Sequence, residues 1–172
     1  MGRELCTILL SKIEEQIERT DRLIGLLPAG HLDWRPAIRQ AFSAGVLIGH
    51  LLECLAGFCA VLLAAEPQRL GHFADLRRLP TNHRCDPTEA RQRIGTYRAR
   101  IQEGFALLQD SDLARRVPTV FVSGGEAVLM LLLGNLEHLV NHKHQLFVYL
   151  QQIGVEVGSE DLYHFRGKGH GE

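Results

Sequence analysis

Residues 135–154, which read NLEHLVNHKHQLFVYLQQIG, contain the pattern on which the fold prediction depends. Their leucines recur at spacings of three, four and seven, as on the buried face of an amphipathic helix. On or beside that face stand His138 and His142, one helical turn apart, with His144 close behind. An apolar face gains little from an imidazole, because a buried polar group costs free energy unless it finds a partner. The pattern therefore predicts a helix and raises the question of what its histidines contact.

The overall composition is that of an ordinary globular domain. The chain of 172 residues fits one domain that buries its own core, and its 45% apolar and 23% charged residues are typical of that class. The net charge of −1 gives no reason to expect a polyanion such as DNA, and no basic run indicates a membrane surface. We therefore expect neither nucleic acid nor a membrane among the partners.

The first residues and the cysteines bear on location. The stretch MGRELCTILLSKIEEQIERT meets acidic residues too early for a signal peptide, and the uninterrupted apolar runs of the chain fall short of the about 20 residues that span a bilayer. The cysteines Cys6, Cys54, Cys59 and Cys85 form no CxxC pair and are most simply reduced thiols. These features predict a cytoplasmic protein.

Clusters of glycine and proline separate four amphipathic segments, which we predict as helices. The segments cover about residues 4–27, 43–65, 86–108 and 123–154. Ser43 is a good N-cap, and the sequences DPTE at 86–89 and SGGE at 123–126 both match capping boxes. Gly154 supplies a C-terminal stop for the last helix.

Four such helices without a convincing strand run predict an all-α four-helix bundle. We place the bundle in residues 1–157 and treat 158–172 as a polar, glycine-rich C-terminal tail. Residues 113–123, LARRVPTVFVS, could add a short extended piece over one end. The link at 66–85 is long enough to cross the bundle lengthwise, so up-down-up-down connectivity is not required.

The histidine pair suits a metal, because imidazoles four residues apart on a helix have their Cβ atoms about 6 Å from each other. His50 lies on the inward face of the second predicted helix, and a bundle builds metal sites from inward-facing residues of different helices. With His138 and His142, it could complete a set of three imidazoles that leaves open positions, as in catalytic zinc sites. The alternative is that these histidines are ordinary core or boundary residues.

Other side chains could support the three histidines. Glu53 and Glu137 could orient the ligand histidines, because a bound imidazole usually donates its other N–H to an acceptor. Gln145 lies one turn beyond His142 and could hydrogen-bond near the metal. Cys54 lies one turn beyond His50 and could approach the ion as a fourth ligand, although a buried apolar thiol is the simpler interpretation. His144 is about 200° around the helix from His142 and cannot join the same ion.

Here the sequence resembles the DinB-like (DinB/YfiT) superfamily of DNA-damage-inducible four-helix bundles. Residues 138–154, HLVNHKHQLFVYLQQIG, are similar to the metal-histidine helix of that family. The matching positions are His138, His142, Lys143, Gln145-Leu146, Tyr149-Leu150 and Gly154, with His144 at a variable position. Upstream, residues 26–58 resemble the segment around the family's second helix, with Trp-Arg-Pro at 34–36 and His50 in the ligand position. Phe42-Ser43 stands where the family usually has Trp-Ser.

The resemblance implies that His50, His138 and His142 bind a divalent metal, usually zinc or nickel, with iron as a further candidate. It also implies an up-down-down-up bundle, in which the 66–85 link forms the long crossover between helices 2 and 3, and frequent homodimers. Some relatives are thiol-dependent transferases or isomerases, and many have no established reaction.

Three functional hypotheses follow. The first is a metal-dependent enzyme whose ion activates a water or a low-molecular-weight thiol, for thiol S-transfer or hydrolysis; no catalytic residue besides the ligands can be assigned. The second is a non-enzymatic metal-binding stress-response bundle. The third is a metal-free bundle that dimerises through its helix faces. No GxSxG, GxGxxG or P-loop sequence supports a serine hydrolase or a nucleotide enzyme, and no HExxH supports a zinc protease.

Overall fold

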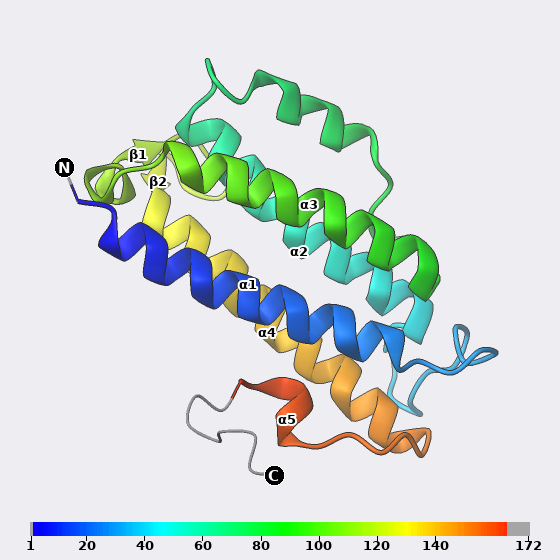
Figure 1. Ribbon diagram of the computed structural model, residues 1–172. Coiled ribbons are helices and arrows are strands. Elements are labelled where there is room, and N and C mark those ends of the chain that lie inside the picture. Colours follow the sequence, from blue (N-terminus) through cyan, green and yellow to red (C-terminus); the bar gives the residue numbers. More distant parts are fainter. Residues whose placement is uncertain (1, 165–172) are drawn as a thin grey trace, which may run out of the picture.

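The computed structural model describes residues 2–164 and consists mainly of four long helices (Figure 1). They are α1 (Glu4–Gly25), α2 (Ala44–Ala65), α3 (Pro87–Leu107) and α4 (Val128–Gln152). The shorter elements are the 3-10 helices η1 (Gly71–Arg78) and η2 (Asp110–Ala114), the strands β1 (Arg116–Val117) and β2 (Glu126–Ala127), and the helix α5 (Ser159–Leu162). The predicted all-α bundle is confirmed.

The chain crosses the bundle up, down, down and up. In Figure 1, α1 and α4 run in one direction while α2 and α3 run in the other. The link between α2 and α3 returns along the outside of the bundle and carries η1 on its way. An ion pair between helix ends agrees with this order. Asp21 near the end of α1 pairs with Arg91 near the beginning of α3 at 3.0 Å. The crossover therefore places the beginnings of α2 and α3 at the same end of the bundle.

Local sequence explains where α2 and α3 begin and where α4 ends. The Ser43 hydroxyl accepts from Val46 N at 3.4 Å, and the Asp86 carboxylate accepts from the N–H groups of Thr88 and Glu89 at 2.8 and 3.0 Å. Such caps satisfy N–H groups that the first helical turn leaves without intrahelical partners. At the far end of α4, Gly154 takes the left-handed conformation at φ 83°, as predicted for a C-terminal stop.

Two expected capping boxes do not form. The SGGE segment does not begin a helix: Gly124 and Gly125 turn the chain at φ 86° and 80°, Glu126 pairs with Val117 in the β1–β2 ladder, and α4 starts only at Val128. The reason is that the strand pairing uses backbone groups that a helical turn would need. At α3 the Glu89 carboxylate bonds His83 and Arg93 instead of closing the box.

Helix α2 is the most buried of the four, because it packs against α3, α4 and the crossover helix η1. Its most apolar window has a mean hydropathy of 2.2, so that length and composition alone would let this helix cross a membrane. However, 61% of that window is buried inside the bundle. Its hydrophobicity is that of a core helix, with Leu47, Leu51 and Phe58 almost fully inaccessible.

Part of the predicted tail packs against the bundle. Asp161 in α5 pairs with Arg22 at 2.5 Å, Arg19 donates to the carbonyl of Glu160 at 3.0 Å, and the Lys143 ammonium donates to the carbonyl of Leu162 at 2.8 Å. The first residues of the expected tail are therefore held on α1 and α4. The remainder, residues 165–172, lies outside the described residues.

Candidate metal centre

His50, His138 and His142 converge between α2 and α4. The antiparallel packing of these helices brings a residue from the first half of α2 beside residues at the middle of α4. His50 Nε2 lies 3.1 Å from the Nε2 atoms of both His138 and His142. One ligand atom from each residue lies within 4.8 Å of the other two. The three imidazoles that the sequence analysis selected therefore meet at one point.

The outer nitrogens of two rings are held by acceptors. His50 Nδ1 donates to Asn82 Oδ1 at 2.5 Å and also lies 3.0 Å from Glu53 Oε2. His142 Nδ1 donates to Gln145 Oε1 at 2.9 Å. An imidazole that keeps its proton on Nδ1 presents the lone pair of Nε2. Both rings therefore direct a free lone pair toward the common point.

This arrangement fits a small cation. The Nε2 lone pairs of His50 and His142, which face each other across 3.1 Å, repel unless a positive centre lies between them. A tetrahedral ion with metal–nitrogen distances of about 2.0–2.1 Å separates its imidazole nitrogens by about 3.3 Å, close to the separation found here. The imidazole donors suit zinc, nickel or iron. The two separations from His50 Nε2 lie within a few tenths of an ångström of that value.

Burial keeps the α4 histidines uncharged. The pKa of His138 is lowered mainly because burial disfavours the imidazolium, and secondarily by the neighbouring His50. Burial also lowers the pKa of His142, although its hydrogen bond to Gln145 acts in the opposite direction. A metal ligand must be the neutral imidazole. Both rings are thus in the form that binds a metal at neutral pH.

Asn82, a residue of the crossover that the sequence analysis did not select, completes the surroundings of His50. Its φ of 56° is left-handed, a conformation that asparagine tolerates better than most residues. Its N–H donates to Gly49 O at 3.2 Å, which ties the crossover to α2. A Cβ atom at Gly49 would lie 2.0 Å from His83 O, so only glycine permits this approach. No local pattern in the sequence predicts the contact between His50 and Asn82, which are 32 positions apart.

The other predicted residues separate into those near the histidines and those away from them. Glu53 and Gln145 contact ligand histidines, as anticipated. The Cys54 thiol instead contacts the carbonyl of His50 at 3.5 Å in the buried core and is not among the gathered ligand atoms. Glu137 is exposed and His144 points to solvent beside Phe147. Glu137 and Cys54 therefore do not orient the cluster.

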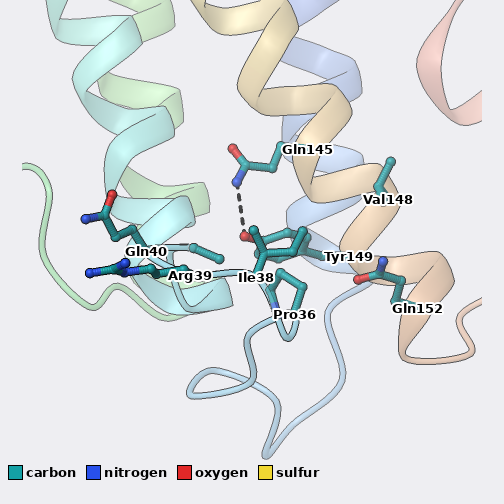
Figure 2. Close-up of a pocket in the computed structure, with 9 residues that line it drawn as sticks. Pro36, Ile38, Arg39, Gln40, Gln145, Val148, Tyr149 and Gln152 are labelled. Atoms are coloured by element: carbon teal, nitrogen blue, oxygen red, sulfur yellow. Dashed lines mark hydrogen bonds between the residues drawn. The ribbon is translucent and has the colours of Figure 1, made fainter.

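Aromatic side chains and a surface pocket border the cluster. The ring of Phe42 lies 5.2 Å from that of His50 and 6.4 Å from that of His142. Gln145 donates to the Tyr149 hydroxyl at 3.0 Å, and this hydroxyl donates to Phe42 O at 3.1 Å. Figure 2 shows Gln145 and Tyr149 in the wall of a pocket of about 400 Å³. The remaining lining residues are Pro36, Ile38, Arg39, Gln40, Ala41, Val148 and Gln152.

Comparisons with known proteins agree with this architecture. The crystal structure of the DinB-like protein YjoA from Bacillus subtilis matches with a TM-score of 0.65 and 20% sequence identity, over 86% of this chain and 92% of that one. At this identity the likeness shows the fold alone. No curated protein matches the sequence. The sequence profile of the DinB superfamily matches residues 12–146, which include all three clustered histidines. A family match over most of the length, together with the bundle topology, shows that this chain belongs to the DinB superfamily.

Proposed function

We propose that the protein is a divalent-metal-dependent enzyme in which His50, His138 and His142 bind one ion. The observation that supports this proposal best is the convergence of the three Nε2 atoms while Asn82 and Gln145 hold the outer nitrogens of two rings. Hydrogen bonds of this kind normally accompany metal-bound histidines, since they fix the tautomer and the ring plane. A purely structural role for the histidines would not require their lone pairs to face one another.

The proposed reaction is thiol S-transfer or hydrolysis. A bound ion in such a site lowers the pKa of a coordinated water or low-molecular-weight thiol, which supplies a nucleophile near neutral pH. The protein's own contribution is to lower the pKa values of His138 and His142 by burial and to fix the ring of His50 through Asn82 and Glu53. Zinc or nickel is the proposed metal, with iron as a third candidate, because three imidazoles suit all of these ions.

The pocket beside Gln145 supplies room for a substrate. Its volume of about 400 Å³ falls within the range of small-molecule sites, and its wall includes the aliphatic side chains of Ile38 and Val148. Gln145 belongs both to this wall and to the hydrogen bond with His142. A substrate seated there would lie against Gln145, the lining residue that holds His142.

The first test is elemental analysis of protein purified without a histidine tag or added metal. We expect about one equivalent of zinc, nickel or iron at the triad, lost in His50→Ala and His138→Ala while helix content stays close to that of the unchanged protein. His144→Ala is the matched control, because His144 is exposed on the same helix and away from the cluster. Retention of full metal content in both triad variants would contradict the proposal.

The second test separates an enzyme from a metal-binding stress-response protein. Metal-loaded protein is screened with low-molecular-weight thiols plus electrophilic acceptors, and with activated esters and amides. Turnover that disappears in His138→Ala and persists in His144→Ala supports catalysis. Metal binding without any turnover across both substrate sets would favour the non-enzymatic role.

A further inference from the structure

A second group of metal-ligating side chains lies where the crossover meets α3. His83 and Cys85 come from the last residues of the crossover, and Glu89 comes from the first turn of α3. One ligand atom from each of the three lies within 4.8 Å of the other two. None of them belongs to the His50 cluster, whose ligands come from α2 and α4.

We propose that His83, Cys85 and Glu89 form a second site for a divalent cation of the zinc type. Imidazole, thiolate and carboxylate are the three side-chain ligands that zinc uses in proteins. Cys85 is fully buried at the floor of the site, whereas the side chains of His83 and Glu89 are 28% and 39% exposed at its rim. An ion can therefore approach from solvent and leave a position for water.

The hydrogen bonds of the three residues leave this site available. His83 Nε2 contacts Glu89 Oε1 at 3.0 Å, and an ion between them would replace this bond with two metal bonds. His83 Nδ1 is buried and has no hydrogen-bond partner within residues 2–164. Because the Glu89 carboxylate can only accept, it holds the ring proton on Nε2 in the absence of a cation. An ion bound at Nε2 would move that proton to Nδ1, which no other described group occupies.

Arg93 and the Cys85 thiol determine the charge of the site. Arg93 donates to Glu89 Oε1 at 3.2 Å and to the Tyr97 hydroxyl at 3.1 Å, so the guanidinium holds the carboxylate in place. In the absence of a cation the buried Cys85 thiol donates its proton in a hydrogen bond to the Asp86 carbonyl at 3.5 Å. Binding forms a sulfur–metal bond and releases that proton to solvent, with no change of oxidation state. The thiolate and Glu89 then offset the two charges of the ion, while the Arg93 guanidinium leaves one positive charge beside Glu89.

Cobalt(II) titration tests the proposal, because a thiolate bound to cobalt gives a charge-transfer absorption in the near ultraviolet that imidazole and carboxylate ligands do not. Full-length reduced protein, freed of metal by chelation, is titrated with Co²⁺ alone. We expect two equivalents at saturation and the charge-transfer band. Cys85→Ser should lose the band and one equivalent. Cys59→Ser is the matched control, because Cys59 is also buried but belongs to neither described cluster, and it should keep both.

Further variants keep the two metal sites distinguishable. His138→Ala should lose one equivalent and keep the band. If it loses one equivalent while no form of the protein shows the band, the triad stands and the second site is wrong. A band that survives Cys85→Ser also overturns the second site. If Cys85→Ser does not fold, Glu89→Gln is used in its place. We expect the affinity for Co²⁺ at the site that gives the charge-transfer band to fall at least about tenfold, because even residues that only hydrogen-bond to metal ligands have effects of that size. An unchanged affinity would contradict the proposal.

Discussion

The orientation of a ligand histidine depends on what its outer nitrogen contacts. His50 has two acceptors there, Asn82 Oδ1 at 2.5 Å and Glu53 Oε2 at 3.0 Å, whereas His142 has Gln145. Asn82 differs from the other two because it reaches its histidine from the crossover rather than from the same helix. A single side chain thus connects the long link to the candidate metal centre.

We predict that Asn82→Gly weakens metal binding at the triad by about tenfold or more, whereas Asn82→Asp keeps it close to that of the unchanged protein. Glycine tolerates the φ of 56° but provides no acceptor, and aspartate restores an oxygen in the same place. Competition with a chelator of known affinity, at several pH values, measures the difference. Equal affinity in all three proteins would show that Asn82 does not position His50.

Lys143 is a buried charged residue that follows directly on His142. Its ammonium donates to Gln16 Oε1 at 2.6 Å and to Leu162 O at 2.8 Å, and its residue is only 1% exposed. Burial lowers the pKa of Lys143 from 10.5 to about 8. Between those two values the unfolded chain binds a proton that the folded protein has released, so this residue's contribution to stability rises with pH.

We therefore predict that the stability of the unchanged protein relative to Lys143→Met increases as the pH rises from about 8 to about 10.5. The comparison with the variant is necessary because the buried thiols Cys54 and Cys59, whose pKa values are raised to about 12, have the opposite effect on stability above pH 9. Urea unfolding at a series of pH values gives both curves. A difference that is constant or falls over this range would contradict the prediction.

The close contact of the crossover with α2 depends on glycines one helical turn apart. Gly45 and Gly49 face the chain at residues 82–85, where Cys85 N donates to Gly45 O at 3.0 Å and Asn82 N to Gly49 O at 3.2 Å. A side chain at either position would meet backbone atoms, which cannot rotate away. The backbone approach, rather than any side-chain packing, therefore determines how near Asn82 and His83 lie to α2.

We predict that Gly49→Ala destabilises the protein by about 1–3 kcal/mol, the usual cost of overpacking, and also reduces metal content at the triad. Gly95→Ala is the matched control in the interior of α3, where an added Cβ meets nothing within 4 Å. It should stabilise the protein by about 0.5–1 kcal/mol, because alanine loses less backbone entropy in a helix. Chemical denaturation measures the free energy of unfolding of both variants, and elemental analysis measures their metal content. A Gly49→Ala protein with unchanged stability and full metal content would contradict the prediction.

Exposed apolar side chains gather at the end of the bundle where α1 and α4 begin. Leu5 and Ile8 at the beginning of α1 are 58% and 59% exposed, Met130 at the beginning of α4 is 57% exposed, and Phe121 between the two strands is 85% exposed. The elements that carry them lie near one another in Figure 1. Apolar surface of this kind on a folded domain commonly marks an interaction site.

We propose that the protein is a homodimer and predict that Ile8→Glu or Met130→Glu shifts it toward monomer, because each would bury a charge in the interface. Ile38→Glu, at the other end of the bundle and 67% exposed, serves as the control and should leave the assembly unchanged. Light scattering coupled to size-exclusion chromatography reports the mass. A monomer at every concentration, or a dimer unaffected by both substitutions, would rule this surface out.

The sequence by itself determined the helices, the all-α bundle and the identity of the three clustered histidines. These features are local: the leucine spacing, the caps at Ser43 and Asp86, and the HxxxH pair depend on residues within one or two helical turns of each other. The match to the DinB superfamily covers the same segments. His50 was placed with the pair because inward faces of different helices meet in a bundle.

Only the tertiary structure decided the late start of α4, the contact of Asn82 with His50 and the grouping of His83, Cys85 and Glu89. The SGGE segment satisfies a capping pattern locally, yet pairing of Glu126 with Val117 uses the backbone differently. Asn82 reaches His50 only because the crossover lies against glycines of α2. Such contacts depend on how distant segments pack, and a pattern confined to a few residues contains no information about backbone groups that approach from elsewhere in the chain.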